Sequence, residues 1–150
     1  MTVRRSVVFA VGVGLLISLS AVSSRTEPAK VAPGTMWVLL NHVKADQRAS
    51  FERFAYERLL PALKKGAAAD PILKKVHGQT RMLVPKEANP DGTYTYIWLM
   101  DPVAPGADYE YRAILEKAYS KQETDEAIAL MEGSMASPQA GYTVSSSTRW

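Results

Sequence analysis

The nine-residue stretch Thr93–Asp101, Thr-Tyr-Thr-Tyr-Ile-Trp-Leu-Met-Asp, constrains the fold of this chain more than any other segment. It is rich in β-branched and aromatic residues and contains neither Gly nor Pro, which is typical of a central strand. Because side chains alternate across a strand, one face carries Tyr94, Tyr96, Trp98 and Met100, and the other carries Thr93, Thr95, Ile97 and Leu99. Both faces are largely apolar, so we expect this strand to lie in a sheet that is covered on each side.

The N-terminus has the features of a secretory signal. Arg4 and Arg5 form a positive n-region, and the apolar run Val7–Leu19 is too short to span a bilayer comfortably. We therefore expect residues 1–24 to be a signal peptide, residues 25–35 a flexible leader and residues 36–150 one domain, located in the periplasm or secreted. An uncleaved segment would instead anchor the protein, and this is the only membrane contact that we expect.

Composition excludes several classes of function. Two of the three net positive charges come from Arg4 and Arg5, so the mature chain carries about +1 and has no electrostatic footprint for nucleic acid. The absence of Cys excludes disulfides, thiolate metal sites and a catalytic thiol. No phosphate-binding or dinucleotide-binding motif is present.

The order of predicted elements defines the fold class. We expect strands at 36–44, 76–85, 93–101 and 142–150, with helical residues at 45–65 and 108–131. The turn signal Asn89–Gly92 predicts that the second and third strands form an antiparallel hairpin, and Pro61 is expected to kink or end the first helix near Leu60. The order predicts an α+β, ferredoxin-like βαββαβ fold, in which a four-stranded antiparallel sheet carries both helices on one face.

Helices on one face leave the other face of the sheet open. The row of Tyr94, Tyr96, Trp98 and Met100 must lie on one of these two faces, and an exposed apolar patch of that size marks an interaction surface. We therefore predict a homodimer in which two sheets pack face to face.

A strand near residue 36 opens directly into a Phe-containing helix that ends Leu59-Leu60-Pro61-Ala62-Leu63. Together with the element order, this resembles the dimeric α+β barrel superfamily over about residues 36–150; its best-known members are antibiotic-biosynthesis monooxygenases and haem-degrading monooxygenases. In the haem-degrading members an Asn on the first strand, a Trp near the end of the third and a His on the second helix form the site. Asn41 and Trp98 lie in comparable places, whereas residues 108–131 contain no His.

Four residues form the candidate catalytic set. We assign Asn41 as a donor to a ligand carbonyl, Trp98 as a stacking wall, His77 as a proton acceptor and Arg81 as an anion clamp. The structural alternatives are a strand-end turn residue for Asn41, a solvated hairpin edge for the face of His77 and Arg81, and a core position for Trp98.

A second group consists of candidate ligand-binding residues: His42, Tyr94, Tyr96 and Met100. The aromatic rings could line a pocket for a flat apolar ligand, or they could belong to a helix-packing core or a dimer interface. His42 and His77 are the only histidines, without the spacing of a metal site, so we expect no metal and no cofactor.

These features predict an exported protein that binds a small apolar or aromatic molecule. If it is an enzyme, cofactor-independent oxygenation is the predicted chemistry. The alternative is a non-catalytic, extracytoplasmic binding or interaction module whose aromatic face is only a dimer interface. Haem binding through His42 or His77 is a third hypothesis.

Overall fold

The computed structural model describes residues 34–145. The predicted signal peptide, nearly all of the predicted leader and the last five residues of the predicted final strand lie outside this range. Within it, no helix has the length and apolar character needed to cross a membrane.

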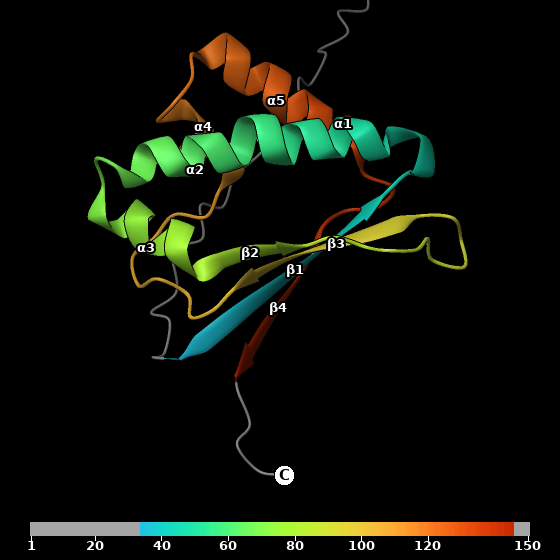
Figure 1. Cartoon of the computed structure of the whole chain (residues 1–150), viewed down its shortest axis with the longest axis horizontal. Coiled ribbons are helices and arrows are strands. Elements are labelled where there is room, and N and C mark those ends of the chain that lie inside the picture. The colour runs from blue at the N-terminus through green and yellow to red at the C-terminus, as the bar shows by residue number, and fades with distance from the viewer. Residues whose placement is uncertain (1–33, 146–150) are drawn as a thin grey trace, which may run out of the picture.

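The described chain forms a four-stranded sheet with helices on one face (Figure 1). Its elements are β1 (Thr35–Val43), the 3-10 turn η1 (Ala45–Gln47), α1 (Arg48–Arg53), the π-helical segment η2 (Phe54–Leu59), α2 (Leu60–Ala67), α3 (Pro71–Gln79), β2 (Thr80–Leu83), β3 (Tyr94–Met100), α4 (Tyr111–Glu116), α5 (Lys121–Ser134) and β4 (Ala140–Ser145). The strand order is β2-β3-β1-β4, and each neighbouring pair is antiparallel. The predicted ferredoxin-like α+β fold is therefore confirmed.

The aromatic row of β3 faces the helices. Tyr96, Trp98 and Met100 are at most 2% exposed, and they belong to the same core cluster as Phe51 and Phe54 of the first helical run. The interpretation of this row as a dimer interface is wrong, because the helices of the same chain already cover it.

The opposite face of the sheet is not covered by any described element (Figure 1). Cross-strand partners point to the same face of a sheet, and the pairs Val38↔Leu99 and Leu40↔Ile97 lie on this side. Leu83, Tyr142 and Val144 extend the same face and are 48%, 55% and 37% exposed. This uncovered face carries Ile97 and Leu99 of β3 and their cross-strand partners, together with Leu83, Tyr142 and Val144. We call it the open sheet face.

The helix α3 includes residues 76–79, which the sequence assigns to a strand, and this corrects the position of His77. Asp70 caps the helix by accepting hydrogen bonds from the amides of Ile72 and Leu73, and Pro71 occupies its first turn. The helix then continues to Gln79, because burial of Leu73 and Val76 favours helical periodicity over the strand predicted from residue 76. His77 consequently lies on a helix and does not share a strand face with Arg81.

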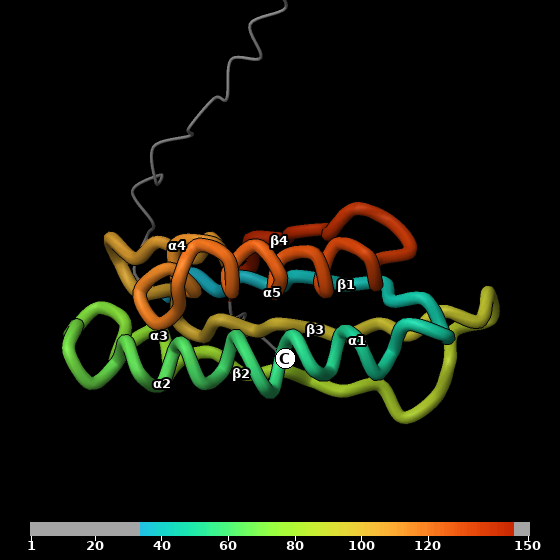
Figure 2. Tube along the Cα trace, turned by 90° about the horizontal axis from the view of Figure 1, so that it is seen from above, coloured from blue at the N-terminus to red at the C-terminus, as the bar shows by residue number. Residues whose placement is uncertain are grey.

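Pro61 does not end the first helix. Figure 2 shows α1 and α2 as one continuous coil along the sheet, joined by η2. Proline has no amide hydrogen to offer the carbonyl of Glu57 four residues earlier. In the wider π-helical turn before Pro61, the Leu60 amide donates to the carbonyl of Ala55, five residues earlier. The Tyr119 hydroxyl donates to the Arg58 carbonyl at 3.2 Å and lies 3.5 Å from that of Glu57. Because α2 begins at Leu60 directly after η2, the predicted end of the helix near Leu60 is wrong, whereas the alternative of a kink stays a prediction.

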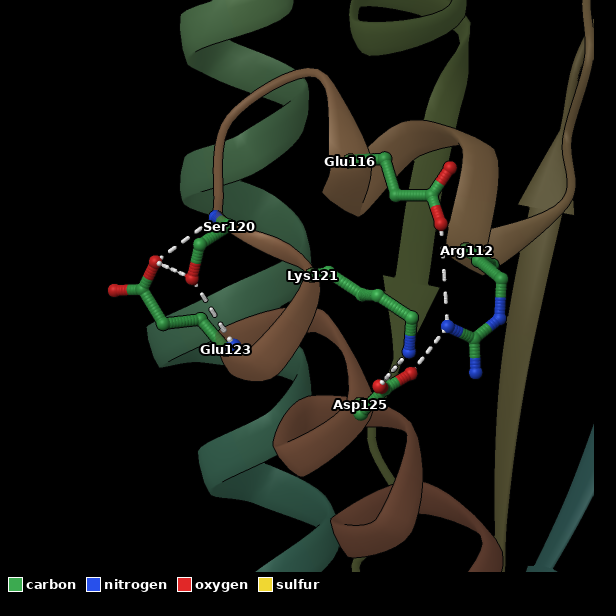
Figure 3. A network of polar contacts seen from close by, with 6 residues as sticks. All are labelled: Arg112, Glu116, Ser120, Lys121, Glu123 and Asp125. Carbon is green, nitrogen blue, oxygen red and sulfur yellow. Dashed lines mark hydrogen bonds and ion pairs between the residues drawn. The ribbon is translucent and has the colours of Figure 1, made fainter.

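The second helical region divides into α4 and α5. Ser120 starts α5 with a capping box, in which its hydroxyl accepts from the Glu123 amide while the Glu123 carboxylate accepts from the Ser120 amide (Figure 3). Asp125 of α5 pairs with Arg112 of α4 and with Lys121, which ties the two helices together (Figure 3). Tyr111, the first residue of α4, packs on Phe54 of the first helical run.

Candidate functional site

A small apolar cavity lies between the sheet and the helices, beside Trp98. Its volume is about 20 Å³. The sheet contributes Leu39, Thr80, Trp98 and Met100, and the helices and connections contribute Leu59, Leu63, Val76, Tyr109, Tyr111 and Ile114. The cavity therefore lies where β1, β2 and β3 meet η2, α2, α3 and α4.

Two residues that line this cavity each have a buried polar atom without a hydrogen-bond partner among the described residues. These atoms are Nε1 of Trp98 and Oγ1 of Thr80. A buried polar group without a partner costs roughly 1–3 kcal/mol, so such groups require an explanation. An indole N–H can only donate, whereas a hydroxyl can donate or accept. Together they suit a group that carries a hydrogen-bond-accepting oxygen.

The cavity in its present form is small. A volume of about 20 Å³ exceeds the roughly 10–15 Å³ that one water needs, and is far below that of a typical ligand pocket. An aromatic ligand would fit only if part of the wall moved.

One wall of the cavity is held by a chain of three polar side chains. Nε2 of Gln139 donates to the Tyr111 hydroxyl and to Oδ1 of Asn41, both at 2.7 Å. Asn41 is fully buried, and its own amide group approaches the Tyr96 carbonyl at 3.4 Å. Burial raises the pKa of Tyr111 to about 12, so its hydroxyl is neutral at physiological pH.

Tyr111 also lines a much larger groove of about 550 Å³. This groove lies between α4, the end of α5 and the connection to β4, and it is lined by Glu110, Tyr111, Met131, Glu132, Met135 and residues 136–139. Tyr111 is the residue that the groove and the cavity share.

A separate polar cluster lies along the first helical run. The Tyr96 hydroxyl donates to the Glu52 carboxylate, and Nε of Arg48 donates to both of these groups. The bond from Tyr96, together with that from Arg48, lowers the pKa of Glu52. Burial and the Glu52 contact raise the pKa of Tyr96 to about 12. The Arg48 guanidinium also lies 4.7 Å from the centre of the Tyr94 ring. These contacts within the protein account for the position of each side chain in the cluster.

The structure brings some of the predicted site residues together. Asn41 and Trp98 both lie on the helix-facing side of the sheet. Asn41 is paired with Tyr96, which belongs to the same buried row of β3 as Trp98. Trp98 and Met100 line the cavity, and Asn41 reaches its wall through Gln139 and Tyr111.

The other predicted site residues lie elsewhere. Arg81 and His42 point to the open sheet face, where Arg81 is 3.6 Å from Asp101 and Nδ1 of His42 lies 3.0 Å from the Thr95 hydroxyl. His77 is in the last turn of α3. The two histidines therefore share no cavity with Trp98, and the described residues hold no cluster of three or more His, Cys, Asp or Glu that could bind a metal.

Sequence reasoning did not identify Thr80, Tyr111 and Gln139 as site residues. Thr80 is one of several polar residues on a short strand, and Tyr111 has the helical spacing of an ordinary packing residue. Gln139 lies in a connection without a motif. Their shared position depends on tertiary contacts, and no local signal in the sequence marks it.

Comparisons with known proteins add little to this description. No family model matches the chain, and no curated protein matches its sequence. Among solved structures, the chain is similar to a protein from Caulobacter crescentus CB15 described as a "putative antibiotic biosynthesis monooxygenase", at 16% identity and a TM-score of 0.40, over 76% of this chain and 91% of that one. The sheet order and helix placement establish the ferredoxin-like fold by themselves.

Proposed function

We propose that this protein binds a small, largely apolar molecule with a hydrogen-bond-accepting oxygen in the cavity beside Trp98. The observation that supports this is that two side chains lining one apolar cavity each carry a buried polar atom without a partner among the described residues, Nε1 of Trp98 and Oγ1 of Thr80. A ligand oxygen that accepts from the indole N–H would remove part of the cost of burying these groups.

Binding is better supported than catalysis. Cofactor-independent oxygenation requires a group that takes a proton from the substrate. The titratable side chains lining the cavity are Tyr109 and Tyr111, and burial raises the pKa of both, so neither acts as a base at neutral pH. His77 and Arg81, the predicted proton acceptor and anion clamp, lie away from the cavity. Oxygenation is therefore the second candidate, favoured only by the shared face of Asn41 and Trp98.

Two further parts of the proposal concern the protein's state. Export follows from the signal-like residues 1–24. Homodimer formation is supported by the open sheet face, because exposed apolar side chains on a sheet can be covered by a second copy of the same face across a two-fold axis.

Native mass spectrometry of protein purified from its own compartment tests the binding function. We expect wild-type protein to carry a small molecule that is lost in Trp98→Phe, which removes the indole N–H. The matched control is Trp37→Phe, because Trp37 packs on Tyr109 at 5.3 Å but does not line the cavity. A wild-type protein without any bound molecule, and without ligand uptake on soaking, would contradict the proposal.

A further inference from the structure

The cavity and the groove share one lining residue. Tyr111 lines both the cavity of about 20 Å³ and the groove of about 550 Å³. It belongs to the first turn of a six-residue helix that follows an irregular connection.

The surroundings of the Tyr111 ring resemble those of a bound phenol. The edge of the ring packs on Phe54, with centroids 5.4 Å apart and an interplanar angle of 70°. Its oxygen accepts a hydrogen bond of 2.7 Å from Gln139. The amide of Gln139 is in turn oriented by the fully buried Asn41.

We infer that Tyr111 occupies the place of the ligand's own ring: the ligand is a neutral phenol or aryl ketone that displaces Tyr111 and takes over the hydrogen bond from Gln139. This inference rests on the proposed binding function and names its ligand class. The exchange conserves both the aromatic contact with Phe54 and the hydrogen bond, so displacement loses little. It also brings the ligand against Trp98 and Thr80.

The charge of the groove supports a neutral ligand. Among the described residues, its lining contains the carboxylates of Glu110 and Glu132 and no Lys or Arg, although Arg112 lies near enough to Glu132 to interact with its charge. An aromatic carboxylate that approaches Tyr111 through this groove would meet like charges on its lining. Gln139 can donate to a neutral oxygen as it does to the Tyr111 hydroxyl.

The first measurement concerns access to the cavity. We would follow the hydrogen-exchange rate of the Trp98 indole N–H by NMR, with the Trp37 indole as an internal reference. Tyr111→Ala should accelerate exchange at Trp98 at least tenfold and leave Trp37 unchanged. The matched control is Tyr56→Ala, which removes a half-exposed ring away from the cavity and should leave both rates unchanged. An unchanged Trp98 rate in a folded Tyr111→Ala protein would overturn the inference.

The second measurement concerns ligand class and remains informative if Tyr111→Ala does not fold. The full chain is titrated with p-cresol, with toluene as the analogue without oxygen and with p-toluate as the anion. Wild-type protein should prefer p-cresol to both. Gln139→Ala should lose about three- to tenfold of the preference for p-cresol over toluene, the range expected for one hydrogen bond. Equal binding of p-cresol and toluene by wild-type protein would overturn the inference.

The two proposals fail differently. If a copurified molecule is displaced by Trp98→Phe but the Tyr111 and Gln139 variants change nothing, only the inference about Tyr111 is wrong. If no molecule copurifies and neither p-cresol nor toluene binds to wild-type protein, the binding function is wrong as well.

Discussion

Two threonines show how a hydroxyl group can lower or raise the stability of the fold, depending on its hydrogen-bond partners. The hydroxyl of Thr80 is buried without a partner, whereas that of Thr95 accepts from Asn89 at 2.8 Å and lies 3.0 Å from the His42 ring. Removing an unpaired buried hydroxyl recovers its desolvation cost, and removing a paired one leaves its partners unsatisfied.

We therefore expect Thr80→Val to raise the free energy of unfolding by about 1 kcal/mol and Thr95→Val to lower it by about 1 kcal/mol. Urea unfolding of the two ligand-free variants measures both changes. If Thr80→Val destabilises as much as Thr95→Val, the Thr80 hydroxyl has a partner in solution, and the ligand-binding argument loses one of its two unpaired groups.

Ionisation of Tyr111, which lines the cavity, should make the free energy of unfolding depend on pH. Its folded pKa of about 12 lies above the value of about 10 for an unfolded tyrosine. A raised pKa stabilises the folded state fully below pH 10, and this contribution disappears as the pH rises to about 12. We expect the free energy of unfolding to fall between pH 10 and 12, less steeply in Tyr111→Phe than in wild type. Urea unfolding across this range measures the slopes, and identical slopes would exclude a perturbed Tyr111.

At the scale of elements, the start of α5 depends on one side chain. The capping box of Ser120 and Glu123 satisfies amides that the helix itself cannot (Figure 3). Ser120→Ala should lower the free energy of unfolding by about 1 kcal/mol. Gln122→Ala is the control, because Gln122 lies in the same first turn and bonds only to the exposed Glu126. Chemical denaturation compares the two, and equal losses would mean that the cap contributes nothing specific.

At the scale of the whole molecule, the proposed homodimer rests on the open sheet face. Leu99 lies near its centre, paired with Val38 on one side and Arg81 on the other. Leu99→Lys should convert the proposed dimer into a monomer, because a charge cannot be buried unpaired between two sheets. Light scattering coupled to gel filtration measures the mass.

The control for this experiment is Ile72→Lys. Ile72 is 42% exposed on α3, away from the sheet, so this variant makes the same kind of change without touching the open face. A monomeric wild-type protein would contradict the proposed dimer. An Ile72→Lys variant that also dissociates would place the interface on the helical side of the molecule.

The local sequence determined the type and order of most elements. Tyr94–Met100 forms a central strand because its residues favour an extended backbone, and Asn89–Gly92 forms the predicted turn, with Gly92 at a φ of 81°. These features depend on residues close together in the chain. The βαββαβ fold follows from their order.

Tertiary structure decided which face of that strand is covered and which residues meet at the cavity. Alternation divides β3 into two apolar rows, and only the packing of the helices selects the row of Tyr96, Trp98 and Met100. Burial of Val76 likewise draws His77 into α3, and the same packing brings Thr80, Tyr111 and Gln139 together with Trp98 and Asn41. Such contacts join residues up to 98 positions apart, and their energies are set by the folded chain and not by local propensity.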